Sequence, residues 1–356
     1  MKLWGKEYTR KEYFAHVGNE TQVFGIRPME YRTGDENLVR TLEVDTGSGL
    51  SFSVGENKGM DIYRMSWRGV NIGFCSKAGL HSPYNVNPES PAFRITQGCG
   101  ALYTAGITNV GSPCQDSLGT YMTHGNIKNS AASQVTASGR WEGDDYLMEI
   151  SGDLKEAEFY GRNLFMNRTI RTRAGAKSFI LEDRIENRSF TDDRVMILYH
   201  FNSGFPLLQE NVRLHARIKK AEGLTPVSTE QLSCHMQASA PAAMQEEQLF
   251  SLELAKDAEG MSGSALWNEE LGLGVYVRYR TRELDRFIEW KCMRAGDYAL
   301  GMLPANCLPL GREKANREND GSVLAPFETL TTHLEIGVLD GEEDLHCFEK
   351  WMDTMN

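Results

Sequence analysis

Short apolar segments separated by glycine, asparagine, aspartate and proline make up most of this chain. The alternation of apolar and polar positions is clearest in residues 163–189, NLFMNRTIRTRAGAKSFILEDRIENRS. A period of two is typical of strands with one buried face, so two antiparallel strands are predicted, joined by a turn at Ala174-Gly175. One face of each strand is predicted to carry Leu164, Met166, Arg168 and Ile170, and Phe179, Leu181, Asp183 and Ile185.

Helical periodicity is confined to a few short stretches. In the C-terminal segment at about 342–354, Leu345, Phe348 and Met352 recur at intervals of three and four residues. A second short helix is predicted in residues 9–18, TRKEYFAHVG, which end on a glycine. Because strands far outnumber the helices that could cover them, we expect an all-β fold, a large antiparallel β-sandwich with a few short helices.

No Pro-rich, Ser-rich or highly charged stretch divides the chain into parts. Residues 1–356 are therefore predicted to form a single sandwich domain, with a short N-terminal extension at about 1–35. The segment 228–248, STEQLSCHMQASAPAAMQEEQ, is the most loop-like and is predicted to be a surface excursion.

One strand carries a titratable group where it leaves the core. In VMILYHFNSGFPLL, residues 195–208, a continuous apolar run ends at His200 before an irregular Asn-Ser-Gly exit. Such a run is typical of a strand that is buried on both faces. Taken alone, His200 is better explained as a buried histidine bonded to a backbone carbonyl than as part of a site.

Three further segments carry candidate chemistry. His124 precedes Gly125, which permits close approach of the backbone to a ligand, although an exposed loop histidine is the simpler interpretation. Trp290 and Lys291 are predicted to point to opposite faces of a strand, and the indole would suit either a sugar face or the core. Asp61 stands in an apolar strand and needs a partner, for which Arg64 and Arg68 are the local candidates. 

Composition narrows the partners of the protein. The net charge of the 356-residue chain is −11, which disfavours nucleic acid. We find no apolar run long enough to span a membrane and no secretory signal, so a cytoplasmic location without membrane partners is expected. The seven cysteines form no C-x-x-C pair and the histidines form no H-x-x-x-H pair. Neither a disulfide framework nor a metal site is therefore predicted.

These segments together resemble the aldose 1-epimerase (galactose mutarotase-like) superfamily, and within it the DUF4432 family, over roughly residues 40 to 340. The resemblance rests on motifs in a shared order: GMDI at 59–62, GCGALYTAGITNVG at 98–111, THGNIKN at 123–129, YHFNSGFPLL at 199–208 and EWKCMRAGDYALGMLPANC at 289–307. It implies a large antiparallel sandwich of the galactose mutarotase-like type, which agrees with the strand-rich pattern.

The resemblance also implies an activity, the interconversion of the α and β anomers of a free sugar by acid–base ring opening, with no cofactor and no metal. A base removes the proton of the C1 hydroxyl and an acid protonates the ring oxygen. By resemblance, the catalytic residues would be His200, as the acid, and His124. The substrate-binding residues would be Asp61, Asn202, Trp290, Lys291 and Asn306.

The sequence departs from the family at the base. The family pattern is Gly-apolar-Glu-Pro, whereas this chain has Leu303 before Pro304, and a leucine cannot accept a proton. Either another carboxylate, such as Glu289 or Asp61, has taken over the base role, or the protein is not an ordinary mutarotase.

Three functions therefore stay open: a mutarotase-type isomerase of carbohydrate metabolism, a non-catalytic sugar-binding or regulatory protein, and a different isomerase or lyase acting on a sugar derivative. In each case the expected partner is a small-molecule sugar. The oligomeric state is open, with a homodimer as one expectation.

Overall fold

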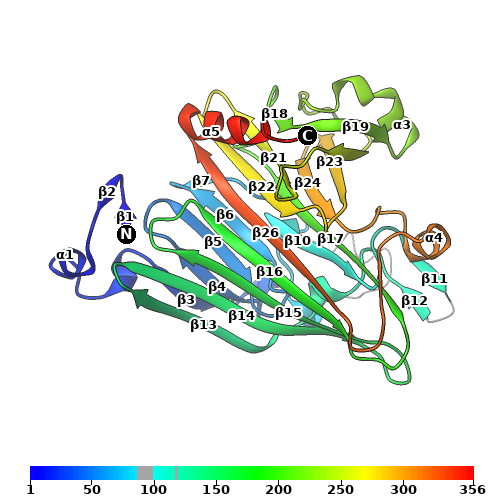
Figure 1. Ribbon diagram of the computed structural model, residues 1–356, viewed down its shortest axis with the longest axis horizontal. Helices are drawn as coiled ribbons and strands as arrows, with labels where there is room; N and C mark the ends of the chain where they lie inside the picture. Colours follow the sequence, from blue (N-terminus) through cyan, green and yellow to red (C-terminus); the bar gives the residue numbers. More distant parts are fainter. Residues whose placement is uncertain (86–98, 117–118) are drawn as a thin grey trace.

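Two antiparallel sheets form the body of the protein in a computed structural model that describes residues 1–85, 99–116 and 119–356 (Figure 1). The larger sheet has 12 strands. Its spatial order is β19 (Ile218–Gly223), β20 (Gln248–Leu254), β23 (Arg286–Arg294), β24 (Asp297–Ala305), β17 (Asp193–Ser203), β10 (Leu102–Ile107), β6 (Ile62–Trp67), β5 (Leu50–Gly55), β4 (Arg40–Asp45) and β3 (Gly25–Glu30), with β25 (Ser322–Leu324) on β17 and β7 (Val70–Asn71) on β6.

The smaller sheet has 8 strands, and the residues that the structure describes also form three two-stranded ribbons beside the sandwich. The order of the smaller sheet is β13 (Ser133–Glu142), β14 (Asp145–Ala157), β15 (Asn163–Arg173), β16 (Ser178–Asn187), β26 (Thr329–Asp340), β22 (Leu273–Arg280), β21 (Met261–Asn268) and β18 (Arg213–Ala216). The ribbons are β1 (Lys2–Leu3) with β2 (Lys6–Glu7), β8 (Phe74–Cys75) with β9 (Cys99–Gly100), and β11 (Cys114–Asp116) with β12 (Gly119–Tyr121). This arrangement confirms the all-β sandwich.

Helices are short and peripheral. The α-helices are α1 (Arg10–Phe14), α3 (Pro226–Glu230), α4 (Arg312–Glu318) and α5 (Glu342–Met352), and the 3-10 helices are η1 (Glu20–Gln22), η2 (Gly34–Glu36), η3 (Pro83–Asn85), η4 (Ile127–Asn129) and η5 (Leu232–Cys234). A capping box formed by Thr9 and Glu12 starts α1, which ends well before Gly18. Among the residues that the structure describes, no helix is long and apolar enough to cross a bilayer.

The predicted hairpin of residues 163–189 is confirmed as β15 and β16. The strands separate at Arg173 and resume at Ser178, and Gly175 in the turn has a φ of +82°. The alternation places the predicted apolar positions toward the other sheet, and the register sets Arg168 opposite Asp183. The hairpin therefore contributes one polar pair to an otherwise apolar face.

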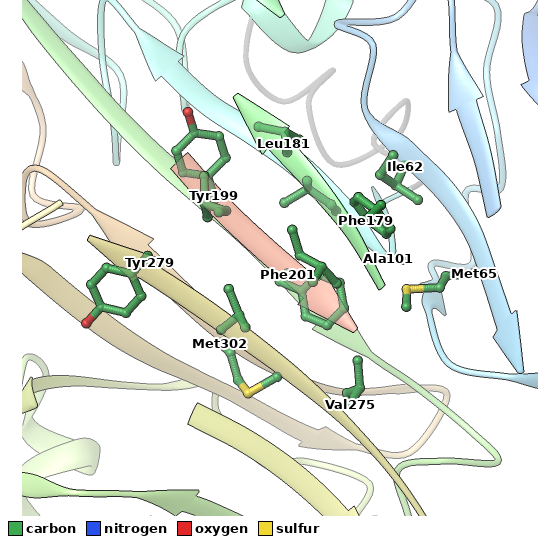
Figure 2. Close-up of a cluster of buried hydrophobic side chains, with 14 of the residues drawn as sticks. Ile62, Met65, Ala101, Phe179, Leu181, Tyr199, Phe201, Val275, Tyr279 and Met302 are labelled. Carbon is green, nitrogen blue, oxygen red and sulfur yellow. The ribbon is translucent and has the colours of Figure 1, made fainter. Parts of the chain in front are cut away.

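The main core lies between the two sheets. Figure 2 shows Tyr199, Phe201 and Met302 from the larger sheet in the same buried cluster as Phe179 and Leu181 from β16. We call the side of the larger sheet that faces this core its interior face and the opposite side its outer face. Because successive residues of a strand alternate, residues next in sequence to core residues lie on the outer face.

Strand β17 lies in the middle of the larger sheet, between β10 and β24, and all of its residues are buried. This confirms the strand predicted to be buried on both faces, but His200 is not where it leaves the core, because β17 continues to Ser203 with every residue buried. Its outer face, with Leu198, belongs to a second apolar cluster that also contains Ala105, Ile288 and Leu303. The outer face is thus covered locally, and it is on this face that His200 lies.

Two other parts of the chain add detail to the expected organisation. The first 35 residues contain β3, which is the edge strand of the larger sheet. The segment 228–248 is only in part a surface excursion, because His235 and Ala238 are buried against the sandwich. Ala238 packs into the main core and His235 is bonded to Glu289, so the segment is held by one apolar and one polar contact although its sequence looks loop-like.

Candidate functional site

His200 lies in a group of aromatic rings on the outer face of the larger sheet. Its ring stacks on Tyr103, its cross-strand partner in β10, with centroids 4.5 Å apart and an interplanar angle of 18°. The indole of Trp290 meets the imidazole edge to face at 5.1 Å. His200 is 6% exposed, whereas Trp290 is half-buried. We refer to His124, His200, Tyr103, Trp290 and Asn202 as the histidine site.

His124 reaches the same place from a tight loop. Its ring centroid lies 6.4 Å from that of His200, with the rings nearly perpendicular at 81°. The loop requires glycine after the histidine, because a Cβ on Gly125 would lie 2.2 Å from the carbonyl oxygen of Gly106. The buried ammonium of Lys128 holds the loop, donating to the carbonyls of Thr123 (3.0 Å), His124 (3.4 Å) and Gly125.

The hydrogen bonds of the two imidazoles define their neutral tautomers. The amide nitrogen of Asn202 donates to the carbonyls of His200 (3.0 Å) and Gly100 (3.3 Å), so its oxygen faces Nδ1 of His200 at 2.5 Å. An amide oxygen only accepts, hence Nδ1 of His200 carries the proton and Nε2 holds a lone pair. In His124 the order is reversed, because Nδ1 accepts from the N–H of Gly111 at 3.2 Å and the proton is on Nε2.

Both histidines are neutral at neutral pH. Burial lowers the pKa of His200 to about 3, and the hydrogen bond from Nδ1 to Asn202 opposes this only in part. His124 keeps some exposure, yet burial lowers its pKa well below the usual value, and repulsion from a protonated His200 and from Lys128 adds to this. The site therefore holds one acceptor nitrogen and one donor nitrogen without net charge on either ring.

The buried neutral histidine predicts a loss of stability in acid. An unfolded chain binds a proton at His200 below about pH 6.5, whereas the folded protein excludes it until about pH 3. Stability from this group is therefore complete above about pH 6.5 and falls as the pH drops. We expect the urea unfolding free energy of wild type to fall more steeply between about pH 7 and pH 5 than that of His200→Phe, which keeps a stacked ring. Parallel curves for the two proteins would contradict the assignment.

Leu303 lies on the outer face beside the histidine site. Its strand partner is Ile288, it is 2% exposed, and both residues belong to the apolar cluster of that face. Gly301, two residues earlier, has no side chain. A Cβ at this position would lie 2.6 Å from Leu303 Cδ1 and 3.3 Å from Asn202 Oδ1, so any other residue here would require the Leu303 side chain to shift. The position that carries the base in the resembled family is therefore next to the histidines but apolar.

Asp61 lies on the other side of the sheet. It accepts from the backbone N–H of Thr104 (3.0 Å), the hydroxyl of Thr104 (2.7 Å) and the guanidinium of Arg168 (2.9 Å). Thr104 pairs with Tyr199 on the interior face, so this carboxylate is separated from His200 by the sheet. The partner of Asp61 is thus Arg168, and the local candidates are wrong: Arg68 pairs with Asp340 and Arg64 is exposed.

Glu289 and Lys291 also lie on the interior face, because Trp290 between them is on the outer one. Glu289 is fully buried and bound to Nδ1 of His235 at 2.6 Å. The ammonium of Lys291 donates to the carbonyls of Cys234 (3.2 Å) and Gln237 (2.8 Å). Both side chains hold the segment 228–248 against the sheet, and the predicted opposite orientation of Trp290 and Lys291 is confirmed.

The side-chain amide of Asn306 makes its hydrogen bonds within the fold. Its amide oxygen accepts from the N–H of Ile197 (2.8 Å), and its amide nitrogen donates to the carbonyl of Val195 (3.0 Å) and to Ser322 (3.1 Å). Of the seven residues named from the sequence, the structure therefore brings together His124, His200, Asn202 and Trp290, and places Asp61, Lys291 and Asn306 elsewhere.

Tyr103 is a residue of the site that sequence reasoning missed. It lies in the apolar strand ALYTAGI, where a tyrosine is an ordinary core residue. The signal that could have found it is the register of β10 against β17, which sets Tyr103 opposite His200. That register joins residues far apart in sequence and is not visible in either strand alone.

Elsewhere, a cavity of about 390 Å³ lies between β18 and α5, and none of the residues of the histidine site lines it. Within residues 1–85, 99–116 and 119–356, no group of three His, Cys, Asp or Glu side chains is placed to hold a metal ion.

Known structures share this architecture. A protein from Klebsiella pneumoniae subsp. pneumoniae, named as a candidate aldose 1-epimerase, aligns with a TM-score of 0.88 at 21% identity over 95% of this chain and 90% of that one. A galactose mutarotase-like protein from Clostridium acetobutylicum aligns with a TM-score of 0.64 at 17% identity, over 90% and 99% of the two chains. A galactose 1-epimerase from Lactobacillus acidophilus aligns with a TM-score of 0.59 at 11% identity, over 90% and 100%.

At these identities the likenesses establish the fold, which is the galactose mutarotase-like sandwich. No protein with a curated description matches the sequence. The family described as a domain of unknown function, DUF4432, matches residues 36–338. Because that match spans most of the sequence, the chain belongs to the DUF4432 family.

Proposed function

We propose that the protein binds a sugar at the histidine site and interconverts its anomers by opening and closing the ring. The observation that carries the proposal is the pair of neutral imidazoles with complementary nitrogens, a lone pair on His200 and an N–H on His124. Anomer exchange needs a proton taken from one oxygen and a second oxygen stabilised as it leaves. The half-buried indole of Trp290 beside them suits the apolar face of a sugar ring.

Two of the structural neighbours support the same chemistry. One is named as a candidate aldose 1-epimerase and another as a galactose 1-epimerase, although both likenesses concern the fold. The aromatic and uncharged character of the described site residues is also what a neutral sugar requires, since hydroxyl groups are recognised by neutral donors and acceptors over an aromatic surface.

Polarimetry tests the proposal. Freshly dissolved single anomers of a panel of aldoses would be followed to equilibrium with and without protein, in a buffer that itself catalyses little exchange. We expect at least one sugar to relax faster with protein. The matched control is His346→Gln, because His346 is an exposed histidine far along the chain in α5 and should leave the rate unchanged. If no aldose relaxes faster, the function is not aldose mutarotation.

Leu303 favours a second candidate, a sugar-binding protein without catalysis, and Leu303→Glu separates the two. If the first proposal is right, the variant gains no activity, because the new carboxyl is buried in an apolar cluster. The variant protein is also expected to lose about 2–3 kcal/mol of stability. Leu303→Gln is the control of equal shape. Polarimetry and urea unfolding would be measured on both. A rise in mutarotation that is specific to Leu303→Glu would show that the natural protein had lost its base, and would support the second candidate.

A further inference from the structure

We propose that His200 alone moves the proton in both directions, with Asn202 as the positioning residue that sets its tautomer and His124 as the hydrogen-bond donor to the departing ring oxygen. This inference rests on the proposed function and gives it a mechanism without a carboxylate. It also changes the role that the resemblance implied, since His200 begins the reaction as a proton acceptor and not as an acid.

The orientation of Asn202 is the first support. Turning its amide around would set the oxygen against two carbonyl oxygens, those of His200 and Gly100, and would leave no donor there. The oxygen therefore stays on Nδ1 of His200, and stacking on Tyr103 holds the imidazole plane. The nitrogen left for a substrate is Nε2 with its lone pair.

The surroundings of His200 are the second support. In the described part of the chain, the ring of His200 pairs with the rings of Tyr103, His124 and Trp290 and is hydrogen-bonded by Asn202, and none of these groups is a carboxylate. Two charged groups contact its neighbours: Lys128 donates to the carbonyl of His124, and Glu247 accepts from the indole N–H of Trp290 at 3.0 Å. Asp61 and Glu289, the carboxylates considered from the sequence, lie across the sheet.

One imidazole is enough to take up the proton and to return it. The C1 hydroxyl gives its proton to Nε2 of His200, and the electron pair left on that oxygen forms the carbonyl bond to C1. The bond between C1 and the ring oxygen breaks, and its electron pair stays on the ring oxygen. Nε2 then returns the proton to that oxygen, which regenerates neutral His200. Both oxygens are attached to C1, so one nitrogen can serve them in turn.

His124 stabilises the charge that develops on the ring oxygen while the ring opens. As the bond to C1 breaks, negative charge builds on the ring oxygen, and the Nε2–H of His124 is the donor that we assign to it. Rotation about the C1–C2 bond exposes the other face of the aldehyde, and the same steps in reverse close the ring as the other anomer. No proton is gained or lost, and no further reactant is needed.

The dependence of kcat/KM on pH is the first test. A neutral acceptor with a pKa of about 3 gives a rate that is constant from about pH 5 to pH 9 and falls only in stronger acid. A histidine acting first as an acid must be protonated, so with the same pKa the rate would decline throughout this range as the pH rises. A decline on the alkaline side between about pH 6 and pH 8 would overturn the inference.

Asn202→Asp tests the positioning role. The aspartate still accepts from Nδ1, but its charge raises the pKa of His200, so the fall of kcat/KM in acid is expected to move to higher pH. If Asn202 only supported the fold, the substitution would change the constant value of kcat/KM near neutral pH but not the pH at which kcat/KM falls in acid. If the fall of kcat/KM in acid stays at the same pH in a folded Asn202→Asp protein, Asn202 is not the positioning residue.

Nitrogen NMR of the imidazoles gives a readout that does not depend on activity. At about pH 7 we expect protonated Nδ1 and bare Nε2 in His200, and the reverse in His124. If no aldose is turned over but these tautomers are found, the proposed function fails and the geometry stands. If anomers are exchanged while His200 is found as the Nε2–H tautomer or as imidazolium, the shuttle is wrong and the function stands.

Discussion

His200→Gln is expected to lower kcat/KM for mutarotation by about 10²–10⁴-fold, mainly through kcat, because general acid–base catalysis by one group is worth that much. Glutamine is close in size, and its amide oxygen can accept a hydrogen bond where Nε2 lies, but an amide does not take up a proton. Binding of the sugar should therefore be largely kept while the proton transfer is lost. Stopped-flow polarimetry with a single anomer measures both parameters.

The controls for this experiment follow from the geometry. His124→Gln keeps an N–H donor and is expected to lose less than His200→Gln. Circular dichroism and urea unfolding must show a folded protein in each case, since His200 is buried and stacked on Tyr103. A folded His200→Gln protein that keeps more than about a tenth of the activity would show that His200 does not carry the proton.

Arg168→Met is expected to lower the free energy of unfolding by about 3–5 kcal/mol, the cost of leaving buried charges without their partner. Arg168 is 0% exposed and donates to Asp61 at 2.9 Å and to Asp183 at 2.8 and 2.7 Å. Its loss strands two buried carboxylates, one of which also accepts from the hydroxyl of Tyr199 at 2.6 Å. Urea unfolding at neutral pH measures the change.

Arg171 on the same strand is the matched control. It lies on the solvent side, its side chain is 46% exposed, and it pairs with Glu149 and Glu182. An exposed pair contributes about 0–1 kcal/mol, so Arg171→Met should cost little. Changing Asp61 and Asp183 to asparagine together with Arg168→Met removes the stranded charges and should recover part of the loss. Equal costs for the two arginine variants would show that the buried network does not stabilise the fold.

Some of the fold was determined by the sequence on its own, because it depends on patterns within one element. The hairpin at 163–189 follows from an alternation of period two, and β17 follows from an unbroken apolar run. The helix α5 follows from the spacing of Leu345, Phe348 and Met352. Each of these patterns is local, so each could be predicted without knowing what lies opposite.

The candidate site was decided only by the tertiary structure, because it depends on which strands are neighbours and which faces they share. Asp61 is bound by Arg168, 107 residues away, because Arg168 reaches it across the core from the opposite sheet, whereas local reasoning proposed Arg64 and Arg68. Alternation predicts that Trp290 and Lys291 point apart, but only the pairing of β23 with β24 and of β24 with β17 shows that the indole is the one on the side of His200.

The same holds for the chemistry of the histidines. The sequence placed His200 in a buried strand, although the strand continues to Ser203 beyond the expected end. Whether His200 donates or accepts depends on the amide of Asn202, which is itself oriented by the carbonyl of Gly100 from a distant segment. Protonation and tautomer are set by burial and by hydrogen bonds to groups that folding brings together, and such contacts leave no periodic signal in the chain.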